Sequence, residues 1–203
     1  MYRVGRSPDP LAWPPATVTG RYNDPQGRFS VLYAASQRRA AFMETLQNFR
    51  PALGDLAILK SLPPSEELDL PFPIGHVPAS YFGKLLAAFH LDRSHKWLDL
   101  RSLQTHAHLR ETLAAELVEA GYAGAFNFGE MIGSDNRITQ LIARWAHDAG
   151  YGGVAYPSAH DGKLTCWAIF NRAPVIPAGY PEPIRRDDPD LIAAIDLFGL
   201  KLP

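Results

Sequence analysis

The sequence predicts an α+β fold, in which a mixed sheet is partly covered by helices, on the strength of three observations. Strand-like segments lie near the beginning and near the end of the chain, and helical patterns occupy the region between them. Strands and helices do not alternate regularly, as they would in a doubly wound fold. A turn signal, Asp161-Gly162, stands between two apolar runs and predicts a hairpin near the C-terminus.

The first part of the chain is expected to form strands around one helix. Residues 24–27, Asp-Pro-Gln-Gly, have the composition of a turn between two strands. Ser36 is the expected N-cap of the helix, which stops before Pro51 because proline disfavours helix in the residue preceding it. The expected elements are strands at Val18–Asn23 and Phe29–Ala34, a helix from Ser36 to about Phe49, and a strand at Leu56–Ser61.

Helical periodicity dominates the middle of the chain. Apolar residues at helical spacing predict one helix around residues 109–118, ended by Gly121, and another over residues 138–149. The second begins at Ser134 or Asp135 and ends at Gly150. The other expected elements are a short helix at Tyr81–Phe89, a short strand at Trp97–Leu100, a hairpin of Gly153–Tyr156 with Leu164–Phe170, and a last helix at Leu191–Phe198.

Composition points to a single globular domain in a reducing compartment. The chain has 203 residues, of which 46% are hydrophobic and 20% charged. A net charge of −1 predicts no overall basic field for nucleic acid. One cysteine, Cys166, permits no internal disulfide and is expected to be inert in a buried strand. We find no signal peptide and no apolar run long enough for a membrane span, so we expect a cytoplasmic protein.

Two residues near the N-terminus have side chains that suit a nucleotide. The guanidinium fork of Arg21 fits a phosphate or pyrophosphate, although a surface arginine on a strand edge is the simpler interpretation. Tyr33 has a ring that can stack on a flat ligand and a hydroxyl that can donate, although a core aromatic is the more common case.

Two further polar residues could complete a pocket. Glu44 has no basic neighbour one helical turn away, so it fits the floor of a cleft as well as a solvated helix surface. Ser158 follows a strand and can hold a ligand hydroxyl or cap a turn, but no nucleophile elbow surrounds it. The spacing of His106 and His108 does not suit a metal, and no other metal motif is present.

The chain resembles the RES-domain family, the toxins of RES–Xre toxin–antitoxin pairs. The resemblance extends from Tyr2 to about Asn171. The matching segments are YRVG, GRYNDP, VLYAAS, AAFMETL, ITQLIARWAHDAGYGGVAYPS and WAIF. Each segment is weak alone, but their combination and order are specific. On this resemblance residues 1–203 form one RES-like domain, with residues 62–96 as an atypical excursion and residues 174–203 as a C-terminal extension.

The resemblance implies an ADP-ribosyltransferase-like fold, with a split mixed sheet around a cleft. It implies an enzyme that cleaves the nicotinamide–ribose bond of NAD as a glycohydrolase or phosphorylase, or that ADP-ribosylates a protein. NAD is then the substrate and no metal is needed. The implied partner is an Xre-type helix-turn-helix antitoxin, without direct binding to nucleic acid or membrane. The family's residues fall on Arg21, Tyr33, Glu44 and Ser158, with Glu44, Arg21 and Ser158 catalytic and Tyr22 a further contact to NAD.

Two alternatives remain open at this point. One is a catalytically silent NAD-binding module on the same fold, which the presence of all four family residues disfavours. The other is an unrelated hydrolase that pairs Glu44 with a histidine, for which His160 is the candidate.

Overall fold

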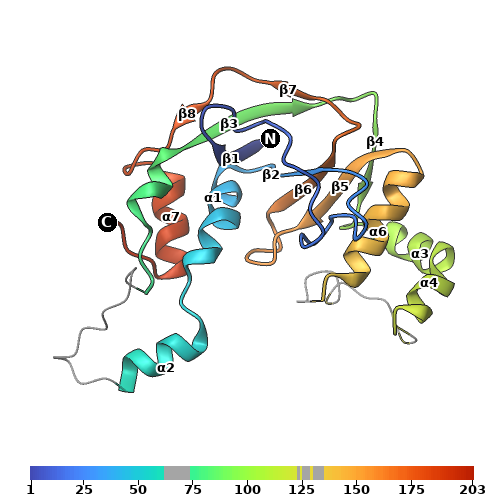
Figure 1. Ribbon diagram of the computed structural model, residues 1–203, viewed down its shortest axis with the longest axis horizontal. Helices are drawn as coiled ribbons and strands as arrows, with labels where there is room; N and C mark the ends of the chain where they lie inside the picture. Colours follow the sequence, from blue (N-terminus) through green and yellow to red (C-terminus); the bar gives the residue numbers. More distant parts are fainter. Residues whose placement is uncertain (62–73, 123, 125–128, 130–134) are drawn as a thin grey trace.

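A single curled sheet forms the centre of the molecule (Figure 1). The computed structural model describes residues 1–61, 74–122, 124, 129 and 135–203. The sheet order is β4-β5-β6-β2-β1-β3-β7, and β8 pairs with β3. Strand β4 runs parallel to β5, and the other pairs are antiparallel, so the sheet is mixed as predicted. The strands are β1 (Tyr2–Arg6), β2 (Val31–Ala35), β3 (Lys84–Leu91), β4 (Lys96–Asp99), β5 (Tyr151–Pro157), β6 (Thr165–Phe170), β7 (Val175–Pro177) and β8 (Glu182–Pro183).

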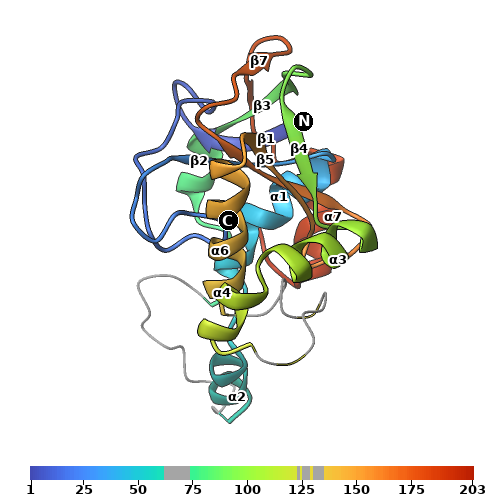
Figure 2. The ribbon, with the colours of Figure 1, turned by 90° about the vertical axis from the view of Figure 1, so that its right-hand side faces the viewer.

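Helices gather at the two ends of the sheet. Helices α1 and α7 lie side by side at one end, and α6, α3 and α4 lie at the other (Figures 1 and 2). Helix α2 projects from the body in both views. The helices are α1 (Arg38–Leu46), α2 (Leu53–Ser61), α3 (Leu103–Thr112), α4 (Ala114–Glu119), α6 (Arg137–Asp148) and α7 (Pro189–Phe198), with 3-10 turns η1 (Gln47–Phe49) and η2 (Ala79–Gly83).

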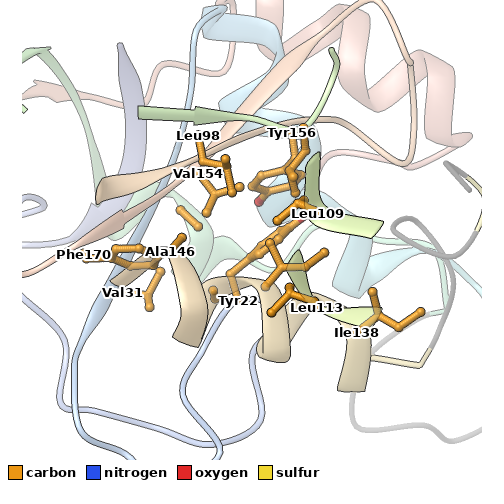
Figure 3. Close-up of a cluster of buried hydrophobic side chains, with 14 of the residues drawn as sticks. Tyr22, Val31, Leu98, Leu109, Leu113, Ile138, Ala146, Val154, Tyr156 and Phe170 are labelled. Carbon is orange, nitrogen blue, oxygen red and sulfur yellow. The ribbon is translucent and has the colours of Figure 1, made fainter. Parts of the chain in front are cut away.

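Each group of helices covers its own apolar cluster. In the first cluster α6, α3 and α4 pack on β4, β5 and β6, and the ring of Tyr22 lies among these side chains beside Tyr156 (Figure 3). In the second cluster α1 and α7 pack together against β1 and β3. Burial of these two faces provides the main favourable free energy of folding.

The sheet parts between β1 and β2. The register of this pair joins only Tyr2 to Ala35, whereas β1 pairs with β3 along its whole length, from Tyr2↔Ala88 to Arg6↔Lys84. Strand β2 in turn pairs along its whole length with β6. Strands β1 and β2 therefore diverge beyond one bridge, and the space between them is open to side chains.

Most of the predicted elements are confirmed. The structure has the helix after Ser36, the strand near Trp97, the helical stretches before Gly121 and Gly150, the C-terminal hairpin and the last helix.

The expected caps differ in detail. Ser36 does not cap α1, because the N-cap position is occupied by Gln37, and the hydroxyl of Ser36 accepts a hydrogen bond from Trp167 Nε1 (2.8 Å). Asp135 accepts from the backbone N–H of Arg137 (2.9 Å) at the start of α6, and Ser134 lies outside the described residues.

The prediction of a strand at Leu56–Ser61 was wrong, because these residues belong to helix α2. Leucine, alanine and lysine favour helix where no neighbouring strand offers hydrogen bonds. The carboxylate of Asp55 also accepts the backbone N–H of Ala52 (3.0 Å), which satisfies a donor at the start of the helix.

The prediction of a helix at Tyr81–Phe89 was also wrong. Its beginning is the 3-10 turn η2, and its remainder lies in strand β3. Pairing with β1 on one side and with β7 and β8 on the other outweighs the helix propensity of the leucines and alanines. Part of the range that we expected to be an excursion thus lies inside the sheet, while residues 62–73 are outside the described residues.

The prediction of a strand at Val18–Asn23 was wrong as well, because these residues form bends and turns. The backbone N–H of Asn23 bonds to the carbonyl of Gly20 (3.1 Å) and closes a turn around Arg21. Within the described part of the chain, none of the helices combines the length and the apolar character needed to cross a membrane.

Candidate functional site

A cavity of about 330 Å³ opens where β1 and β2 part. Its walls come from β1, β2, α1, the turn around Arg21 and the end of β5. Segments far apart in the sequence therefore meet in one place. The lining residues are Tyr2, Arg3, Val4, Arg21, Tyr33, Ala34, Ala41, Glu44, Thr45, Gln47, Tyr156, Pro157 and Ala159.

Arg21 reaches the cavity from a turn that Tyr33 holds in shape. The Tyr33 hydroxyl accepts the backbone N–H of Tyr22 (2.9 Å) and donates to Asn23 Oδ1 (2.8 Å). A Cβ on Gly20 would lie 2.6 Å from Asn23 Oδ1 and 2.8 Å from the Tyr33 hydroxyl, so only glycine fits there. These contacts replace the strand ladder that the sequence had predicted around Arg21.

Tyr33 therefore has two roles. Its ring lines the cavity, as expected of a wall for a flat ligand. Its hydroxyl is committed to the turn, and burial raises the pKa of this phenol above its ordinary value, so it stays protonated at neutral pH.

Arg3 is a second cation at the cavity, and the sequence analysis did not nominate it. Its Nη1 donates to the carbonyl of Tyr33 (2.6 Å) and its Nε to the carbonyl of Pro10 (2.8 Å). The first bond spans the gap between β1 and β2 where the ladder is missing. Burial lowers the pKa of Arg3, but an arginine starts so high that it stays charged. Arg3 could have been nominated from the sequence because it lies in YRVG, one of the segments that carry the family resemblance.

Glu44 brings a carboxylate to the same cavity. Helix α1 buries its alanines, phenylalanine and leucine against the second cluster and turns Glu44 towards the gap in the sheet. Glu44 Oε1 accepts a hydrogen bond from Ser158 Oγ (2.9 Å) and another from Cys166 Sγ (3.2 Å). The absence of a local partner in its own helix, noted in the sequence, is explained by these distant donors.

Ser158 lies behind Glu44 and is not among the lining residues. Ser158 is only 3% exposed, and its hydroxyl also accepts a hydrogen bond from the backbone N–H of His160 (3.2 Å). Tyr156, two residues earlier on β5, does line the cavity. Burial raises the pKa of Tyr156 well above its usual value, so its hydroxyl remains a neutral group beside Glu44.

Tyr22 does not reach the cavity, contrary to the expectation that it contacts NAD. Its side chain is 0% exposed and packs in the first cluster, with its ring centroid 4.5 Å from that of Tyr156 (Figure 3). Its hydroxyl is buried and has no hydrogen-bond partner among the residues that the structure describes, and burial raises its pKa. Because Arg21 and Tyr22 are adjacent in a turn, only one of them faces the cavity, and Tyr22 is the one that anchors the turn in the core.

Gln47 and His160 form a polar pair near Glu44. Gln47 Nε2 donates to the backbone carbonyl of Glu44 (2.8 Å), which leaves its Oε1 to accept from His160 Nε2 (3.0 Å). Burial lowers the pKa of His160, opposed by Glu44 and reinforced by Arg50 and Arg21. The imidazole is thus neutral at pH 7.

The described residues contain no group of three or more histidine, cysteine or acidic side chains placed to hold a metal ion. The profile of one protein family, described as the RES domain, matches residues 1–191. Neither the curated proteins nor the solved structures yield a match to the chain.

Proposed function

The chain belongs to the RES-domain family, and on this basis we propose that it is an NAD-consuming enzyme that cleaves the nicotinamide–ribose bond. The observation that carries the proposal is the meeting of Glu44 with two arginines, Arg21 and Arg3, in one cavity. A carboxylate beside two guanidinium groups suits a substrate that develops positive charge at one atom and bears negative charge on its phosphates.

The chemistry assigned to Glu44 is electrostatic. When the C–N glycosidic bond breaks, its electron pair leaves with nicotinamide, and the ribose acquires oxocarbenium character, as in glycoside cleavage. A fixed carboxylate opposes that charge without having to reorganise. Water or phosphate then adds at the ribose carbon and loses a proton, giving ADP-ribose or its 1-phosphate.

The other cavity residues are assigned to binding. Arg21 and Arg3 grip the pyrophosphate, since a guanidinium fork matches phosphate oxygens. The rings of Tyr33 and Tyr156 supply flat walls for nicotinamide. Ser158 acts through Glu44 rather than on NAD itself, because its hydroxyl donates to the carboxylate.

The finer fold assignment belongs to the same proposal. A sheet that parts between two strands, with the cavity in the gap, agrees with the split sheet expected of an ADP-ribosyltransferase-like fold. This agreement supports NAD as the ligand.

The cellular role we assign is that of a toxin, neutralised by an Xre-type helix-turn-helix antitoxin that blocks the cavity. Family membership supports this role. Expression of the chain alone should arrest growth, and co-expression with the product of the neighbouring gene should relieve the arrest and give a co-purifying complex. Harmless expression with Glu44 intact would overturn the toxin role.

Mass analysis of products after incubation with NAD tests the reaction. Free nicotinamide with ADP-ribose identifies a glycohydrolase, and ADP-ribose 1-phosphate formed only with added phosphate identifies a phosphorylase. A mass increase on a protein identifies an ADP-ribosyltransferase. Unchanged NAD that nevertheless binds would favour the silent module and overturn the proposed activity.

A further inference from the structure

One oxygen of Glu44 receives two donors from outside its helix. Ser158 Oγ lies 2.9 Å and Cys166 Sγ 3.2 Å from Oε1. The Ser158 oxygen already accepts the backbone N–H of His160 (3.2 Å), so its single proton is directed to Glu44. The two donors come from the end of β5 and from β6, which are neighbouring, hydrogen-bonded strands of the sheet.

Cys166 is well placed to stay a donor. It is 0% exposed in β6, where it stands opposite Ala35 on one side and Tyr156 on the other. Burial, together with the neighbouring Glu44 carboxylate, raises the pKa of the Cys166 thiol far above neutral pH. The thiol therefore keeps its proton and can donate it to Glu44 Oε1, which lies 3.2 Å from Sγ.

We propose that Cys166 is a positioning residue for Glu44. Together with Ser158 it holds Oε1 against the sheet, so that the other carboxylate oxygen is presented to the ribose. This inference rests on the function proposed above. A glutamate has three rotatable side-chain bonds, and a charge stabilises a transition state best when its position is fixed before the reaction. Two donors on one oxygen provide that fixation from the sheet, outside the helix that carries Glu44.

Three substitutions of Cys166 separate donation from packing. Cys166→Val removes the donor and keeps the site filled with a somewhat larger apolar side chain. Cys166→Ala removes both the donor and part of the volume, and Cys166→Ser keeps a donor in a smaller side chain. We expect kcat for NAD cleavage to fall about 10-fold in the valine and alanine variants at an unchanged KM, and to stay within about threefold in the serine variant. Equal kcat in all three variants would overturn the proposal, because donation by the side chain at this position would then have no effect. A valine variant faster than the serine variant would also overturn it, because packing and not donation would then set the rate.

A second measurement does not depend on activity. In a double-mutant cycle of Cys166→Ala with Glu44→Ala, followed by thermal unfolding, we expect the two shifts in Tm to be non-additive by about 2 °C. Additive shifts would show that the thiol does not hold the carboxylate and would overturn the proposal. If the shifts are non-additive but the wild-type protein leaves NAD intact, the contact between Cys166 and Glu44 stands and the proposed NAD cleavage is refuted.

Discussion

At the scale of single residues, the charged side chains among the described residues that line the cavity are Glu44, Arg21 and Arg3. Glu44 is held by Ser158 and Cys166, whereas Arg3 is held by backbone carbonyls across the parted strands. The positive charges come from β1 (Arg3) and from the turn around Arg21, and the negative charge of Glu44 lies on helix α1. On the function that we propose, such a division of charge would orient NAD with its phosphates at the arginines and its glycosidic bond at Glu44.

Loss of the guanidinium of Arg21 should weaken NAD binding. In a Glu44→Ala background, which prevents turnover, we expect Arg21→Ala to raise the Kd for NAD about 10- to 100-fold, as measured by calorimetry, because a charge-assisted hydrogen bond is lost. Arg21→Lys should also raise the Kd, since the bidentate fork is lost. The matched control is Arg110→Ala, because Arg110 is an exposed arginine on α3. An unchanged Kd in Arg21→Ala would move the anion site elsewhere.

His160 should make stability depend on pH. Because burial lowers its pKa in the folded protein, the unfolded chain binds a proton more readily than the folded one. The folded state is therefore favoured above the ordinary pKa of about 6.5 and loses this advantage as the pH falls. Measured from pH 7.5 to pH 5, the Tm of the wild type should fall more steeply than that of His160→Gln. Parallel curves would contradict the assignment of a neutral, half-buried imidazole.

At the scale of elements, the turn around Arg21 depends on a glycine. We expect Gly20→Ala to lower the Tm and to weaken NAD binding, because its Cβ would meet Asn23 Oδ1 at 2.6 Å. The two effects should appear together, since the same turn supports Arg21. Gly83→Ala is the control, because no atom lies within 4 Å of its added Cβ. A Gly20→Ala protein with the wild-type Tm would show that the turn is not held as described.

The sequence was informative about elements with strong local signals and uninformative about the others. Helix α6 and the β5–β6 hairpin follow from apolar periodicity and the Asp161-Gly162 turn, and both are confirmed. The segment now in β3 has leucine and alanine, and its state is decided by pairing with β1 on one side and with β7 and β8 on the other. The turn around Arg21 depends on a hydroxyl that arrives from β2. Arg3 was overlooked, and Cys166 was expected to be inert, because only the fold brings them beside Tyr33 and Glu44.

At the scale of the whole molecule, the C-terminal segment is part of the structure that carries Glu44. Helix α7 packs on α1 in the second cluster, and Asp188, which caps α7, also forms an ion pair with Arg38 of α1 (2.5 Å). The segment that we expected to be an extension therefore supports the helix on which the carboxylate stands.

Truncation of a buried side chain on α7 should destabilise the whole domain. Leu191 is 0% exposed, so we expect Leu191→Ala to lower the free energy of unfolding by about 2–5 kcal/mol, measured by urea denaturation. Its neighbour Ile192 is 40% exposed, and Ile192→Ala should have a much smaller effect. Equal effects of the two substitutions would mean that α7 does not pack as the structure has it.

Comparison of Glu44→Gln with the wild type in NAD turnover and NAD binding tests the central claim most directly. The amide keeps the size of the side chain and removes the charge that opposes the oxocarbenium. We expect release of nicotinamide to fall by roughly 10²-fold or more. NAD should still raise the Tm of the variant, because binding to the native state alone stabilises it. A folded Glu44→Gln protein with near-normal turnover, or a Tm that millimolar NAD leaves unchanged, would contradict the account.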